Sequence, residues 1–180
     1  MLRSSAAAAL AVASLTFSAA APAAEHYGLG RAATAGEISA WDIDVRGDGK
    51  GLPAGHGSVA EGRAIFAETC AACHGDKGQG GAGDVLVGGR GTLGTAKPLK
   101  TIGSFWPYAP TIFDYVYRAM PFNAPQSLTA DQVYSVTAYL LFLNGIIPDD
   151  AVLDAASLPR IEMPNRHGFT SDPRPDVKPN

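Results

Sequence analysis

Charged residues are scarce in this chain: they make up 17% of its 180 residues, the formal net charge is −3, and no segment concentrates Lys or Arg. Without a basic patch the chain lacks the electrostatic footprint of a nucleic-acid or anionic-membrane partner, and we expect neither. With 46% hydrophobic residues it is not a wholly disordered chain, and its 21 Gly and 13 Pro exclude a long coiled coil. The composition predicts one loop-rich domain.

Long apolar runs are also few. After Arg3, an Ala-rich apolar stretch covers residues 6–17, and Ala21, Pro22 and Ala23 then fit the small-x-small cleavage pattern. Residues 1–23 are therefore predicted to be a cleaved signal peptide, which implies export to the periplasm. The alternative is an uncleaved anchor, for which this stretch is short and weakly apolar. Nothing later is long enough to span a bilayer, so we expect no membrane span in the mature chain.

Cysteine is limited to two residues, both within the pentapeptide from Cys70 to His74. A C-x-x-C-H run in an exported protein is the attachment signature of a c-type haem. Two thiols three residues apart on a helical turn can each add to one haem vinyl group, and the adjacent histidine then falls beneath the iron. We predict one haem c, covalently bound through Cys70 and Cys73, with His74 as a metal ligand.

Cys70 and Cys73 have three possible roles besides haem attachment. A thioredoxin-like pair would begin a helix within a βαβ pattern, and no such strands are predicted around it. A structural zinc site needs four ligands, but the chain has no other cysteine. A disulfide between residues so close in sequence would close a very short loop and stabilise little.

Methionine is the expected second axial ligand, because thioether ligation raises the potential of electron-transfer haems. Beyond the predicted signal peptide the candidates are Met120 and Met163. Met120 is favoured, because it follows one predicted helix and precedes another, whereas Met163 lies in a Pro-rich stretch. Either residue could instead fill the core. No Ser/His/Asp set, carboxylate pair or phosphate-binding loop rises above background, so we expect no catalytic residues in the chain.

Three helices are predicted. Capping boxes begin one helix at Ser58, running to Cys70, and another at Thr129, running to residue 143. A third is expected over residues 110–119, where Pro110 suits a first turn. Glycine density predicts a loop over residues 75–94. Because these helices cannot bury their apolar faces alone, the apoprotein is expected to fold poorly without haem.

The predicted organisation has four parts. Residues 24–57 form an N-terminal arm anchored by Trp41, residues 58–147 the helical domain, and residues 148–180 a Pro-rich C-terminal tail that wraps the domain or is flexible. The fourth part is the predicted signal peptide, residues 1–23.

The order of helix, C-x-x-C-H, loop, helix, Met and final helix resembles class I cytochromes c. The resemblance implies an all-α fold around one haem, with long irregular extensions at both ends. It places Gly62 and Phe66 of the motif helix against Tyr139 of the last helix. In that family a proline carbonyl commonly accepts a hydrogen bond from the proximal histidine in a Pro-x-Leu-x-Gly segment; here Asp84 replaces the proline, and Leu86 is retained as a haem contact.

Several segments are similar to a narrower group, the cytochrome c subunits of periplasmic sulfur-oxidising enzymes. They are Tyr27–Arg31, Ala40–Arg46, Lys100–Tyr108, Arg118–Phe122, Ala124–Leu128 and Met163–Arg166. In that group the methionine of Arg-Ala-Met-Pro is the usual distal ligand, which independently supports Met120. The resemblance also implies propionate-binding candidates, namely Arg90, Lys100, Thr101, Trp106 and Tyr108, although these residues equally suit a polar loop with buried aromatics.

This narrower resemblance implies a one-electron carrier. Its donor would be a molybdopterin sulfite or sulfane dehydrogenase, and its acceptor a downstream cytochrome or terminal oxidase. Two alternatives stay open: a generic carrier without a sulfur-enzyme partner, and a haem-based sensor or peroxidase-like enzyme with an open distal position.

Overall fold

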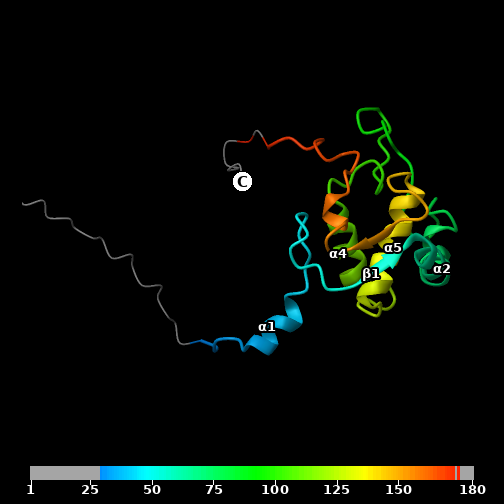
Figure 1. Cartoon of the computed structure of the whole chain (residues 1–180). Helices are drawn as coiled ribbons and strands as arrows, with labels where there is room; N and C mark the ends of the chain where they lie inside the picture. Colours follow the sequence, from blue (N-terminus) through cyan, green and yellow to red (C-terminus); the bar gives the residue numbers. More distant parts are fainter. Residues whose placement is uncertain (1–28, 173, 175–180) are drawn as a thin grey trace, which may run out of the picture. The chain divides into compact units, whose positions relative to one another are not determined.

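The structure is a computed structural model that describes residues 29–172 and Arg174, so the predicted signal peptide lies outside the described residues. The chain divides into two units, Met1–Thr34 and Ala35–Asn180, and the C-x-x-C-H motif belongs to the second. The elements of this second unit, drawn in Figure 1, are α1 (Ala35–Trp41), β1 (His56–Ser58), α2 (Val59–Thr69), α3 (Ala71–His74), α4 (Ala109–Ala119), α5 (Ala130–Leu143), β2 (Val152–Asp154) and the 3-10 helix η1 (Leu158–Arg160).

The three predicted helices are confirmed as α2, α4 and α5. Both capping boxes form: the Ser58 hydroxyl accepts from the backbone N–H of Glu61, and Thr129 and Gln132 make the equivalent pair. Pro110 occupies the first turn of α4, where a missing N–H costs nothing. Residues 75–94, all of them described, contain no helix or strand, as their glycine density predicted.

The packing of α2 against α5 follows the family expectation. The rings of Phe66 and Tyr139 meet edge to face with centroids 5.4 Å apart. Gly62 faces the backbone carbonyl of Ser135, and a β-carbon there would collide with it. Glycine thus lets the two helix backbones approach closely. α5 also packs against α4.

The Pro-rich C-terminal segment wraps the helical domain. β2 pairs antiparallel with β1, and Leu153 lies opposite Gly57. Only glycine fits at position 57, since a side chain there would strike the backbone of Ser135. Leu158 and Met163 are buried in the core. The small sheet adds to the all-α fold without changing its class, and no strand pattern in the sequence predicted two such short strands.

The N-terminal arm differs from its prediction. It contains the short helix α1, none of whose residues is buried. Trp41 was expected to anchor the arm, but 87% of its surface is exposed, so that prediction is wrong. Val45 is the buried residue instead, and its backbone N–H donates to Asp114 on α4 at 2.7 Å. No helix in the described part of the chain is long and apolar enough to cross a bilayer.

Candidate haem site

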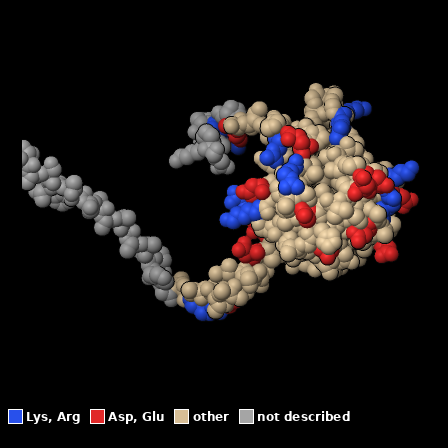
Figure 2. Space-filling model, viewed as in Figure 1, with Lys and Arg blue, Asp and Glu red and all other residues tan. Residues whose placement is uncertain are grey.

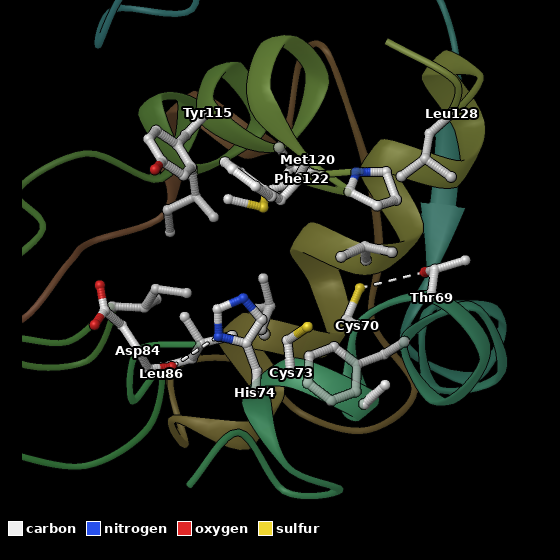
Figure 3. Close-up of a pocket in the computed structure, with 18 of the residues that line it drawn as sticks. Thr69, Cys70, Cys73, His74, Asp84, Leu86, Tyr115, Met120, Phe122 and Leu128 are labelled. Carbon is white, nitrogen blue, oxygen red and sulfur yellow. Dashed lines mark hydrogen bonds between the residues drawn. The ribbon is translucent and has the colours of Figure 1, made fainter. Parts of the chain in front are cut away.

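A cavity of about 740 Å³ lies among α2, α3, α4, α5 and the loop between α3 and α4. Its volume falls in the range of small-molecule and cofactor sites. Figure 3 shows the side chains that line it. Most are apolar; they include Phe66, Leu86, Ile102, Ile112, Val116, Val136 and Leu140. An apolar cavity of this size inside so small a domain can hold a large, largely apolar group in place of a protein core.

His74 lines one face of the cavity at the end of α3. Its Nδ1 donates to the backbone carbonyl of Asp84 at 2.7 Å, the contact expected at the position where the family has proline. This bond assigns the proton to Nδ1 and leaves Nε2 free as a ligand. Gly83 packs on the same ring, because a β-carbon there would lie 2.9 Å from Cε1 and 3.0 Å from Nδ1. The carbonyl and the glycine together orient the imidazole.

Cys70 and Cys73 are free thiols whose sulfur atoms point into the cavity beside His74 (Figure 3). Burial is the main cause of the raised pKa of the Cys70 thiol; it outweighs the opposing hydrogen bond with Thr69 at 3.3 Å, and the nearby Cys73 raises the pKa a little further. Redox-active C-x-x-C pairs need the opposite, a depressed thiol pKa. Among the described residues no group of three or more His, Cys, Asp or Glu could hold a metal ion, which argues against a zinc site.

Met120 faces His74 across the cavity. It is the C-cap residue of α4, and its side chain reaches toward the imidazole from the opposite wall (Figure 3). Met163, the other candidate ligand, is 1% exposed in the core and does not line the cavity. The structure therefore brings Met120 and His74 together at one site and gives Met163 a packing position.

The remaining predicted contacts divide into two groups. Leu86, Lys100, Thr101 and Trp106 line the cavity, whereas Arg90 and Tyr108 do not. The ring of Tyr108 lies beneath the guanidinium of Arg166, 4.2 Å from ring centroid to Cζ, and packs over Gly47. Arg90 is exposed. Contact between haem propionates and these two residues stays a prediction.

Three residues at this site were not predicted from the sequence. Phe122 and Tyr115 line the cavity although both are exposed, Phe122 by 85%. Asn144 donates to the Leu86 carbonyl at 3.1 Å and accepts from the Gly88 N–H at 3.2 Å, which fixes the loop that carries Leu86. The nearness of Phe122 to Met120 in sequence was the available signal for Phe122, whereas the contacts of Asn144 cross 56 to 58 residues of chain.

These residues fit haem c. Two thiols lie beside an imidazole with a free Nε2, and a thioether faces that imidazole across an apolar cavity. Imidazole and thioether form the axial pair of electron-transfer cytochromes c. Cys70 and Cys73 would hold the porphyrin edge covalently, and His74 and Met120 would be the iron ligands.

Two comparisons with known proteins found a match to this chain. Residues 57–140 match the family described as cytochrome c oxidase, cbb3-type, subunit III. A solved structure, the sulfane dehydrogenase SoxCD from Paracoccus pantotrophus, contains a chain that is 49% identical, with a TM-score of 0.78. The match covers 83% of this chain and 74% of that one. A search of curated proteins found no significant match.

Proposed function

The chain belongs to the cytochrome c family, and on that premise we propose that it is a periplasmic monohaem electron carrier serving a sulfur-oxidising enzyme. The donor would be a molybdenum sulfite or sulfane dehydrogenase, and the acceptor a downstream cytochrome or terminal oxidase. The main observation that supports an electron-transfer function is that His74 and Met120 face each other across the cavity, beside two free thiols. The 49% identity to a chain of sulfane dehydrogenase SoxCD supports the choice of donor.

The protein's own residues would bind and tune the cofactor. Bound haem supplies reversible one-electron chemistry at its iron. Cys70 and Cys73 would tether it, while the Asp84 carbonyl accepts a hydrogen bond from Nδ1 of His74, which orients the ring and increases the basicity of Nε2. Met120 would be the second iron ligand, which favours electron transfer over binding of an exogenous ligand.

The donor assignment is tested with purified, oxidised holoprotein. Periplasmic extract of the source cells is added with sulfite, and haem reduction is followed by absorbance. Thiosulfate in place of sulfite, a blank without extract and an unrelated class I cytochrome c are the controls. We expect extract-dependent reduction by sulfite or thiosulfate that is faster than for the unrelated cytochrome.

Each alternative outcome has a distinct meaning. Reduction by thiosulfate alone assigns the donor to the sulfane-oxidising type. Equal reduction of the unrelated cytochrome would indicate a generic carrier. Absence of reduction by either compound would contradict the proposed donor and leave an electron carrier with another partner.

A further inference from the structure

The short helix α1 leaves an apolar face without cover. Ile38 and Trp41 are three residues apart, so they share one face, and they are 52% and 87% exposed. Figure 2 shows that the surface of this part of the chain is largely uncharged. A seven-residue helix is marginal in water unless an apolar face is packed, and nothing in α1 is buried. The helix has the properties of an element that is completed by a binding partner.

The chain that follows α1 is fixed to the helical domain at Val45. Four residues after Trp41, Val45 is buried and its N–H donates to Asp114, which also accepts from Arg118 Nε at 2.8 Å. A chain of four residues spans at most about 14 Å, so Trp41 stays close to this anchor. The anchor lies on α4, whose C-cap residue is Met120. A partner that held α1 would therefore be kept near the helix that carries the distal ligand.

The comparison with the solved structure includes this helix. The matched region is 83% of the 180 residues, or about 149, so it begins no later than residue 32 even if it runs to the last residue. It therefore spans all of α1. The helix therefore lies within the region that is matched to a chain of the crystal structure of sulfane dehydrogenase SoxCD.

We propose that the face formed by Ile38 and Trp41 docks into an apolar groove on the catalytic subunit of the donor dehydrogenase. The inference rests on the proposed function and extends it: the cytochrome is held as a stable subunit by its N-terminal arm, separately from the contact through which electrons pass. Tryptophan is among the residues that most often dominate binding energy at protein interfaces, where it fills a desolvated pocket. Burying the side chains of Ile38 and Trp41 also removes apolar surface from water, which favours binding.

The test measures binding, and the haem-reduction assay described above is run on the same proteins. Holoprotein, its Trp41→Ala variant and a Val152→Ala control are titrated by calorimetry with the purified molybdenum dehydrogenase of the source cells. Val152 is an exposed apolar residue, 57% accessible, on β2. We expect Trp41→Ala to raise Kd about thirtyfold, as for an interface hot spot, and the control to leave Kd unchanged. The haem spectrum and Tm of Trp41→Ala should match those of the unchanged protein, because Trp41 is not part of the core.

Three results would overturn the inference. If Trp41→Ala binds as tightly as the unchanged protein while both are reduced, the arm is not the docking element and the proposed function stands. If the unchanged protein is neither bound nor reduced, the proposed function fails and the inference fails with it. If sedimentation shows a dimer that Trp41→Ala lacks, the face belongs to a second copy of this chain.

Discussion

Gly62 on α2 lies directly against the backbone carbonyl of Ser135 on α5, so that a β-carbon at position 62 would overlap it. Backbone atoms on both sides of this contact leave no flexible side chain that could move aside. The crossing of the two helices, which sets one wall of the haem cavity, therefore depends on glycine at this position.

Substituting Gly62 by Ala should destabilise the protein by about 2 kcal/mol or more, because the helices must separate to admit the methyl group. Chemical denaturation of the holoprotein measures this. Gly94→Ala is the matched control, since nothing lies within 4 Å of a β-carbon there. Equal stability of the two variants would contradict the close approach of α2 and α5.

The two methionines should respond oppositely to substitution. Met120→Ala should abolish the absorbance band of Met-ligated ferric haem, lower the reduction potential and allow rapid carbon monoxide binding to the ferrous protein. Met163→Ala should leave all three unchanged but cost about 3 kcal/mol of stability, because it removes a buried side chain. A changed ligand field in Met163→Ala, with none in Met120→Ala, would reverse the assignment. Rapid carbon monoxide binding by the unchanged protein would favour a sensor or peroxidase-like enzyme.

The ring orientation of His74 should depend on Gly83. A β-carbon at position 83 would press on the imidazole, whose Nδ1 is held by the Asp84 carbonyl. We expect Gly83→Ala to shift the electron paramagnetic resonance g-values of the ferric haem and to lower stability by about 1 to 3 kcal/mol. Gly94→Ala should alter neither property. Unchanged g-values in Gly83→Ala would show that the glycine does not orient the ring.

The stability that comes from the contact between Asp114 and the N-terminal arm at Val45 should depend on pH. Partial burial opposes ionisation, but hydrogen bonds from Arg118 and the Val45 N–H outweigh it, and the pKa of Asp114 is lowered from its ordinary value of 3.8. The unfolded chain therefore takes up this proton at a higher pH than the folded one. The stabilisation is complete at neutral pH and is lost as pH falls below about 4 through the folded pKa.

The corresponding experiment compares Asp114→Asn with the unchanged protein. At pH 7 the variant should be less stable by about 1 to 2 kcal/mol, since a charged acceptor is lost. The difference should shrink toward pH 3. Asp76→Asn, at an exposed carboxylate, is the control. A stability difference that stayed constant from pH 7 to pH 3 would contradict the role of the ionised carboxylate.

The sequence by itself determined the local chemistry and the local structure. The pentapeptide from Cys70 to His74 carries covalent attachment and one ligand in adjacent residues, so no tertiary information was needed to predict haem. The helix starts at Ser58 and Thr129 were equally predictable, because a capping box depends on side chains only three residues apart. The packing of Phe66 on Tyr139 was predictable only through the family resemblance.

Only the tertiary structure decided what depends on contacts between distant segments. It placed Met120 opposite His74 and gave Met163 a position in the core, whereas the sequence favoured Met120 but left both methionines as candidates. It also paired β2 with β1, and it brought β1 against α5, where Gly57 leaves space for the backbone of Ser135. Trp41 was expected to be buried because it is large and apolar, but burial requires a facing surface. In the described chain that surface exists for Val45, which α4 holds through Asp114, and not for Trp41.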